Sequence, residues 1–324
     1  MNPLRIYVDL GMTPDVREVL ERGTTGHELV FPKVPISSVL VKAERDPQFR
    51  SADVAFGQPD LQAISEAAQL KWVHVSSSGI TRYDTPEFRA QMAQRGISVS
   101  NSARVYNEAC ATHVLGFMLA QARCLPWALK SRAANGSDSW VSLRNSCTPL
   151  RAQTVLILGY GAIGKRLAEM LRPFDVEIIA HRRKPRGDEG VAVITDEGLP
   201  EVLSRADHVL NILPDSSSTR HFFNAERFEL LKPGAVFYNI GRGGTVDQDA
   251  LLTTLRSGRI KAAWLDVTEP EPLPNDHPLW AEPNCFITPH IAGGHADETL
   301  TLVQHFLENF DRFVRGEPLV DCVI

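Results

Sequence analysis

The first hundred residues alternate short apolar runs with segments of helical spacing. The apolar runs, which we predict to be strands, are 5–10, 51–57, 71–79 with its trailing loop, and 97–101. The segments between them carry helix start and stop signals such as Thr13-Pro14 and Gly23. The predicted helices are 13–23, 60–70 and 85–96. This β-α-β rhythm predicts a parallel, doubly wound α/β sheet.

A second series of the same kind occupies the rest of the chain. Its apolar runs are 154–159, 176–181, 208–214, 235–241, 260–267 and 285–290. Before it, we predict a long apolar helix over 107–134 and a polar loop over 135–149. After it, residues 298–316 predict one amphipathic helix. The chain is therefore expected to form two α/β domains, each with a doubly wound parallel sheet.

Composition narrows the classes of protein that fit this pattern. The 324 residues are 43% hydrophobic and 23% charged, as in globular proteins, and the net charge of −5 argues against a nucleic-acid partner. Five scattered cysteines with no C-x-x-C pair are typical of reduced thiols in a cytoplasmic protein. No apolar run approaches the roughly 18 residues that span a bilayer, so no membrane partner and no signal peptide are expected.

The segment "TVLILGYGAIGKRLAEML" is a strand, a glycine-rich turn and a helix start. Gly159, Gly161 and Gly164 have the G-x-G-x-x-G spacing that lets backbone amides approach a pyrophosphate at a helix N-terminus. A glycine triplet alone is weak evidence, because packing also selects small residues in such turns. Here both flanks match the required context, which favours dinucleotide binding.

A cluster of cations follows the next strand. In a dinucleotide-binding unit, a carboxylate about 20 residues after the motif holds the ribose 2′-hydroxyl. Here Arg182 lies 18 residues after Gly164, flanked by His181 and Arg183. Guanidinium groups would pair with a 2′-phosphate, so we predict that NADP is preferred, with NAD possible. The alternative is an ordinary solvated basic turn.

Each of three further predicted strands is followed by a residue that could take part in carbonyl reduction. Arg242 would anchor a substrate carboxylate and polarise the adjacent carbonyl. His290 would donate the proton that accompanies a hydride, and Glu271 would hold its ring in one tautomer and favour the imidazolium. Each residue has an ordinary structural explanation by itself. The three together, each just past a strand, indicate one site at the carboxyl edge of a sheet.

In these motifs the chain resembles the D-isomer-specific 2-hydroxyacid dehydrogenase family. The resemblance runs through "LGYGAIGKRLA", "NILPDSSSTRHFFN", "LKPGAVFYNIGRGGTVDQDAL", "AAWLDVTEPEPLP" and "NCFITPHIAGG". It implies Rossmann-like domains: a substrate domain of residues 1–104 plus 292–324, and a dinucleotide-binding domain of residues 105–291, with catalysis in the cleft between them. It also implies a homodimer formed through the cofactor domains.

The resemblance assigns roles to individual residues. Arg242, Glu271 and His290 take the catalytic positions, and Arg242 and His290 also contact the substrate. The loop residues Ser77, Ser78 and Gly79 match the family's carboxylate-gripping loop, and Asp266 matches the acid that binds the nicotinamide carboxamide. The expected cofactor contacts are Gly159, Tyr160, Gly161, Ala162, Ile163, Gly164, His181, Arg182, Arg183, Leu213, Pro214, Thr219, Ile240, Gly241 and Asp266.

The substrate is less sharply indicated. We expect a small unphosphorylated 2-oxo acid, glyoxylate or hydroxypyruvate first, reduced to the D-2-hydroxy acid. Trp140 and Trp280 are candidate walls of the substrate pocket, Trp140 through the partner subunit. His113, in an apolar helix, is expected to be structural. The alternatives are an NAD-linked dehydrogenase of another D-2-hydroxy acid and a nucleotide-sensing binding protein of the same fold.

Overall fold

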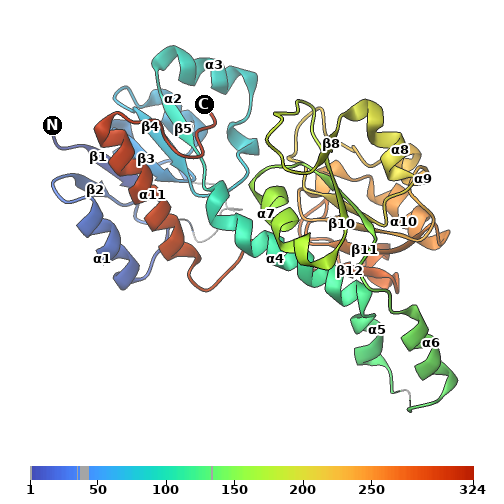
Figure 1. Ribbon diagram of the computed structural model, residues 1–324. Helices are drawn as coiled ribbons and strands as arrows, with labels where there is room; N and C mark the ends of the chain where they lie inside the picture. The colour runs from blue at the N-terminus through green and yellow to red at the C-terminus, as the bar shows by residue number, and fades with distance from the viewer. Residues whose placement is uncertain (1, 35, 37–43, 133) are drawn as a thin grey trace. The chain divides into compact units, whose positions relative to one another are not determined.

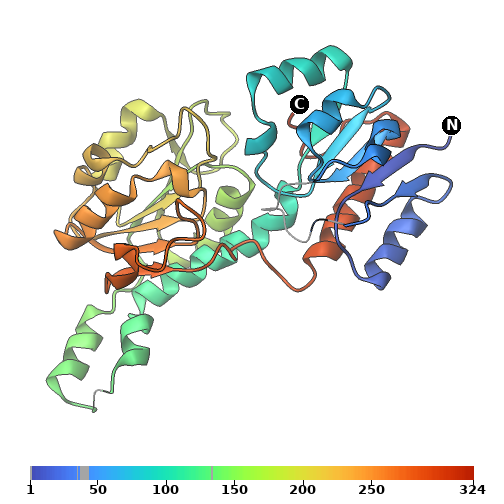
Figure 2. The same ribbon diagram turned by 180° about the vertical axis from the view of Figure 1, so that it is seen from behind.

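The computed structural model describes residues 2–34, 36, 44–132 and 134–324 (Figures 1 and 2). The chain divides into two compact units, one of Met1–Tyr106 with His295–Ile324 and one of Asn107–Gly294. Each unit is built on a sheet whose strand pairs are all parallel. The prediction of two doubly wound parallel sheets is confirmed.

The first unit has a five-stranded sheet in the order β2-β1-β3-β4-β5. The strands are β1 (Arg5–Val8), β2 (Glu28–Val30), β3 (Val54–Gly57), β4 (Trp72–Val75) and β5 (Ser98–Ser100). The helices of its N-terminal part are α1 (Pro14–Gly23), α2 (Leu61–Glu66) and α3 (Pro86–Arg95), with 3-10 turns η1 (Pro47–Ser51) and η2 (Thr81–Tyr83). Strand β2 follows the first helix and was not predicted, because three residues are too few to show a period.

The last helix of the chain, α11 (Glu298–Arg315), completes the core of this first unit (Figures 1 and 2). Its Phe306 stacks on Phe56 of β3 and on Trp72 of β4, with ring centroids 4.4 and 5.3 Å apart. The predicted amphipathic helix is therefore confirmed, and it ends at Gly316 in the left-handed conformation, φ 70°. Residues from the two ends of the sequence share one apolar core.

The second unit has a seven-stranded sheet in the order β12-β11-β10-β9-β6-β7-β8. The strands are β6 (Thr154–Leu158), β7 (Glu177–His181), β8 (Ala192–Ile194), β9 (His208–Asn211), β10 (Ala235–Asn239), β11 (Ile260–Leu265) and β12 (Cys285–Ile287). The helices are α4 (Ala103–Ala122), which begins in the first unit, α5 (Leu125–Lys130), α6 (Asp138–Ser146), α7 (Ala162–Leu171), α8 (Leu199–Leu203), α9 (Ala225–Glu229) and α10 (Gln248–Arg256). The 3-10 turns are η3 (Arg172–Phe174), η4 (Asp196–Gly198), η5 (Gly243–Thr245) and η6 (Pro278–Ala281).

Two predictions in the middle of the chain are wrong. The helix expected over 107–134 is divided at Cys124, whose φ of 52° breaks the helical path just before Pro126. The polar stretch 135–149 is not a loop throughout but contains α6, whose N-terminus is capped by the Ser137 hydroxyl. Most of α6 is exposed, so it lacks the apolar face that would have marked it as a helix.

Helices α5 and α6 form a pair that projects away from the sheet of the second unit (Figures 1 and 2). The pair displays three exposed apolar side chains, Leu125, Leu129 and Val141. No helix in the described part of the chain is both long and apolar enough to cross a membrane.

Candidate active site

The glycine-rich turn between β6 and α7 has the form that a pyrophosphate requires. Gly159 adopts φ +91°, and a Cβ there would lie 2.6 Å from the carbonyl oxygen of Ile212. Gly164 also packs closely against the turn itself, since its Cβ would lie 3.0 Å from the Gly159 carbonyl oxygen. By contrast, a Cβ at Gly161 would meet nothing within 4 Å. The turn therefore leaves open space at the α7 N-terminus, which fits a dinucleotide phosphate.

The basic side chains after β7 already have hydrogen-bond partners within the protein, which their sequence does not indicate. His181 is buried, and its Nε2 lies 2.7 Å from the Asp196 carboxylate. Arg182 donates from Nη1 to the Glu189 carboxylate at 3.3 Å. Arg183 is exposed and reaches the Ser218 hydroxyl at 3.4 Å. A cofactor phosphate could therefore form ion pairs with the two arginines, whereas His181 already contacts a carboxylate.

Glu271 and His290 lie together beyond the carboxyl ends of β11 and β12. Glu271 Oε1 is 2.8 Å from His290 Nδ1, as expected for an acid that holds an imidazole. The ring N–H does not point in line with that oxygen, so Nδ1 makes an ion-pair contact without an aligned hydrogen bond. Nε2 has no hydrogen-bond or ion-pair partner among the described residues, so this end of the ring is available to exchange a proton with a ligand.

Arg242 follows β10, the neighbour of β11, and is held by backbone contacts. Its Nη1 donates to the Gly241 carbonyl at 2.7 Å, and its own carbonyl accepts bonds from Asn239 Nδ2 at 3.1 Å and Thr245 Oγ1 at 2.7 Å. No carboxylate pairs with the guanidinium among the residues that the structure describes. Arg242 is thus fixed in place while its charge stays available to an anion.

Three buried polar residues support this arginine loop, and the sequence reading missed them. Asn211 Nδ2 donates to Thr245 Oγ1 at 2.7 Å and to Asn239 Oδ1 at 3.2 Å. All three side chains are nearly or fully buried. The signal was present, because an Asn at the end of an apolar strand must find partners when it is buried.

Asp266, at the end of β11, already has several hydrogen-bond donors. Its oxygens accept bonds from Thr288 Oγ1 at 2.6 Å and from the backbone amides of Ile291 and Ala292, each at 2.9 Å. His113 approaches it at 3.7 Å, and burial lowers the pKa of this imidazole although Asp266 opposes the shift. In this structure Asp266 orders the segment that follows His290. Its contact with a nicotinamide carboxamide stays a prediction.

The remaining predicted cofactor contacts surround the same carboxyl edge of the second sheet. A Cβ at Gly241 would lie 2.6 Å from the Leu213 carbonyl, so the loops after β9 and β10 touch. Thr219 Oγ1 donates to the Pro214 carbonyl at 2.6 Å and fixes the loop after β9. Leu213 and Ile240 are almost entirely buried, while Tyr160, Ala162 and Ile163 belong to the glycine turn and the start of α7.

The predicted carboxylate-gripping loop belongs to the first unit. Its carbonyl groups are tied down, since Asn101 Nδ2 donates to the Ser78 carbonyl at 2.6 Å and the Ser102 amide donates to the Ser77 carbonyl at 3.1 Å. The amides of Ser77, Ser78 and Gly79 have no acceptor among the residues placed in the structure. Successive backbone N–H groups without acceptors can bind an anion.

The two candidate tryptophans have local partners. Trp140 lies on α6 with the Arg144 guanidinium 4.6 Å from its ring centroid. Trp280 is 49% exposed and donates from its indole nitrogen to the Pro274 carbonyl at 3.0 Å. Their roles in a substrate pocket stay predictions.

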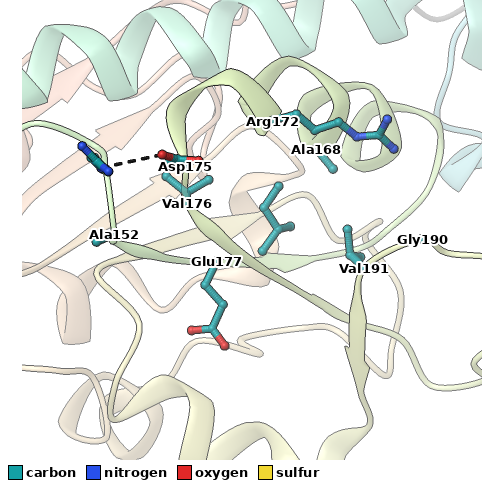
Figure 3. Close-up of a pocket in the computed structure, with 10 residues that line it drawn as sticks. Ala152, Ala168, Arg172, Asp175, Val176, Glu177, Gly190 and Val191 are labelled. Atoms are coloured by element: carbon teal, nitrogen blue, oxygen red, sulfur yellow. Dashed lines mark ion pairs between the residues drawn. The ribbon is translucent and has the colours of Figure 1, made fainter.

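A hollow of about 650 Å³ in the second unit lies elsewhere (Figure 3). Its lining includes Asp175 and Glu177 at the amino end of β7 and Arg172 after α7. Arg151 and Asp175 form an exposed ion pair at its edge, 3.6 Å apart. It contains none of the predicted site residues. This agrees with the general rule that ligands of such sheets bind at the carboxyl ends of the strands, since the hollow lies at an amino end.

Comparisons with known proteins agree with this geometry. A family model for the D-isomer specific 2-hydroxyacid dehydrogenase NAD binding domain matches residues 115–292. Human glyoxylate reductase/hydroxypyruvate reductase is 34% identical over 254 residues, covering 78% of this chain and 76% of the human protein. Glyoxylate reductase of Aeropyrum pernix is 32% identical over 329 residues, covering 97% and 93%.

Solved structures agree as well. The NADPH-dependent glyoxylate/hydroxypyruvate reductase of Sinorhizobium meliloti, in complex with NADP and malonate, superposes with a TM-score of 0.74 at 28% identity, covering 100% of this chain and 97% of that one. A D-isomer specific 2-hydroxyacid dehydrogenase of Xanthobacter autotrophicus Py2, in complex with NADPH and MES, gives a TM-score of 0.80 at 25% identity, covering 100% and 98%.

Fold, site and comparisons together define a nicotinamide-dependent oxidoreductase. The chain belongs to the D-isomer-specific 2-hydroxyacid dehydrogenase family, whose members act on 2-hydroxy and 2-oxo acids with NAD or NADP. The predicted family and enzyme class are confirmed.

Proposed function

We propose that the protein reduces small 2-oxo acids of the glyoxylate and hydroxypyruvate type to D-2-hydroxy acids, with NADPH as the preferred hydride donor. The single observation that carries the proposal is the 2.8 Å contact between Glu271 and His290, because an imidazole held by a carboxylate is suited to deliver a proton. Relatives named as glyoxylate reductases, at 32–34% identity, support the substrate class.

The residues divide the reaction between them. The glycine turn would hold the dinucleotide, which when bound supplies the hydride. Arg242, with no carboxylate of its own among the described residues, would hold the substrate carboxylate and polarise the carbonyl. His290 would protonate the carbonyl oxygen from Nε2, and Glu271 would balance the charge of the ring from the Nδ1 side.

The proposed carboxylate loop can be tested separately from the catalytic residues. The free amides of Ser77, Ser78 and Gly79 would bind the substrate carboxylate. Gly79→Pro would remove one of these donors, so we expect KM for glyoxylate to rise several-fold while the Kd for NADPH is unchanged. An unchanged KM would remove the loop from the substrate site.

The choice of cofactor depends on Arg182 and Arg183. Two guanidinium groups stand where an NAD-specific unit places a carboxylate, which supports NADPH. NAD is the alternative cofactor, because Nη1 of Arg182 already contacts Glu189 and only the rest of that guanidinium is open to a phosphate. A panel of 2-oxo acids assayed with both cofactors decides: a higher kcat/KM with NADH would refute the preference. Binding of NADPH without turnover of any 2-oxo acid would favour a nucleotide sensor.

We also propose a cytoplasmic homodimer formed through the second unit. The projecting pair α5 and α6 carries Leu125, Leu129 and Val141 exposed, with Leu129 at 83%, which supports burial against a second copy. Light scattering of the purified protein should give twice the mass of the chain. Leu129→Glu should shift the protein toward monomer.

A further inference from the structure

Glu189 is the one carboxylate that contacts the proposed phosphate-binding arginines among the described residues. Its side chain is only 2% exposed, although both of its neighbours in sequence are exposed. A carboxylate is buried at a loop tip only when it has strong partners, because removing its charge from water is costly. The hydrogen-bond partners of Glu189 therefore indicate its role.

Glu189 accepts three hydrogen bonds. The backbone amide of Arg186 donates to Oε1 at 2.7 Å, and the amide of Gly187 donates to Oε2 at 2.9 Å. The third donor is Nη1 of Arg182, at 3.3 Å from Oε1. These bonds lower the pKa of Glu189, the Arg186 amide being the largest contribution. The residue is therefore an anion that closes the loop 182–189 onto itself.

The same loop is also tied to the glycine turn. The hydroxyl of Tyr160, between the first two glycines of the motif, donates to the backbone carbonyl of Glu189 at 3.3 Å. Residue 189 thus contacts both the arginine and the turn that would hold the pyrophosphate. A ribose 2′-phosphate lies a fixed number of bonds from that pyrophosphate, so the distance between the two sites has to be held.

The contact to Glu189 uses only one end of the Arg182 guanidinium. Arg182 has five N–H donors, and its guanidinium makes no other hydrogen bond or ion pair in the described part of the chain. Nε and Nη2 remain for a phosphate, with Arg183 beside them. Because three donors already compensate the charge of Glu189, its effect on orientation should outweigh its repulsion of a second anion.

We propose that Glu189 is a specificity-determining positioning residue: it orients Arg182 and ties its loop to the glycine turn so that the pair of arginines selects a 2′-phosphate. The inference deepens, and rests on, the proposed NADPH preference. It predicts that Glu189 contributes to the discrimination between phosphorylated and unphosphorylated ribose and contributes little to binding of the rest of the cofactor.

The test measures Kd values for NADPH, NADH, 2′,5′-ADP and 5′-ADP with wild type, Arg182→Ala, Glu189→Gln and the double variant. Glu189→Gln keeps the size of the side chain but loses the charge and places an amide N–H against a donor. We expect Kd for NADPH and 2′,5′-ADP to rise roughly tenfold, as for a lost charge-assisted hydrogen bond, while NADH and 5′-ADP change less than about twofold. In the Arg182→Ala background the same change should have no further effect.

The matched control is Asp188→Asn, since this neighbouring carboxylate is exposed and only approaches Lys165, at 3.9 Å; all four Kd values should stay as in wild type. If Glu189→Gln does not fold, Glu189→Asp keeps the charge but withdraws it from Arg182, and a smaller loss confined to NADPH and 2′,5′-ADP is expected.

The outcomes separate the inference from the proposed function. A wild type that prefers NADH refutes the NADPH preference itself. If wild type prefers NADPH and Arg182→Ala abolishes that preference but Glu189→Gln does not, the proposed function stands and the inference fails. Equal loss of all four ligands means a merely structural role, and tighter NADPH binding means that the carboxylate repels the phosphate; both results overturn the inference.

Discussion

Two arginines follow strands of the same sheet and are held in opposite ways. Arg182, after β7, is held through its side chain by a carboxylate of its own loop. Arg242, after β10, donates to the Gly241 carbonyl and accepts bonds at its own carbonyl from the Asn239 side-chain amide and the Thr245 hydroxyl, and its charge has no carboxylate partner among the described residues. The difference indicates different tasks. In the proposed function, the first arginine would discriminate between two cofactors that are alike elsewhere, and the second would bind the carboxylate that the proposed 2-oxo acid substrates share.

The largest effect is expected on kcat when His290, which follows β12, is replaced. It tests whether His290 takes part in the same reaction step as Arg242. His290→Ala should lower kcat about 10³-fold, because the variant would lack the proposed proton donor, and leave the Kd for NADPH nearly unchanged. Steady-state kinetics and fluorescence titration give the two values. A comparable loss of NADPH binding would show that His290 serves the cofactor side instead.

Arg242→Ala should lower kcat/KM for glyoxylate by at least about 10²-fold, because a carboxylate anchor and the polarising charge are lost together. Arg242→Lys should recover only a small part, since one ammonium cannot reproduce the planar fork. The ratio of the Kd values for NADPH and NADH should stay constant in both variants. A changed ratio would break the division of tasks between the two arginines.

Arg182→Asp should change the cofactor preference at the loop after β7. We expect the ratio of Kd for NADH to Kd for NADPH to fall by about 30-fold, because a carboxylate repels a 2′-phosphate and accepts a ribose hydroxyl. KM for the 2-oxo acid should not change. Arg186→Asp provides the control, because it changes the charge in the same loop at a residue whose side chain makes no hydrogen bond or ion pair with the described residues.

The smallest effect on the two arginines is expected from a change in the sheet on which both depend. His208 of β9 is buried between Tyr238 and Gln153, and burial lowers its pKa from 6.5 to about 4. Below pH 6.5 the unfolded chain therefore binds a proton that the folded chain does not. The free energy of unfolding should fall by on the order of 3 kcal/mol between pH 6.5 and pH 4.

His208→Gln should remove that part of the pH dependence, measured by urea unfolding at several pH values. His221→Gln, at a ring that is 46% exposed, is the matched control for loss of an imidazole. If the slopes of wild type and His208→Gln coincide, His208 is not the group that titrates. Either way the ratio of the two cofactor affinities should not depend on this residue.

The sequence predicted what is local in the chain and missed what depends on a turn. The glycine turn and the strands that carry Arg242, Glu271 and His290 follow from apolar periods and fixed spacings. The contact of Glu271 with His290 was expected, although their catalytic role stays a prediction. The partner of Arg182 could not be read, because a carboxylate seven residues away meets it only through the path of the loop. Helix α6 was missed because a mostly exposed helix shows no apolar stripe.

The return of α11 to the first sheet has a consequence for synthesis. Phe56 and Trp72 pack against Phe306, which leaves the ribosome some 230 residues after Trp72 at the usual rate of about 5–20 residues per second. During that interval, the N-terminal segment has an uncovered aromatic face, and the glycine-turn sheet, whose last strand is Cys285–Ile287, is completed before Phe306 is made. The sheet that begins first along the chain is thus the one that must finish last, and a nascent chain truncated before residue 298 should need a chaperone to stay unaggregated.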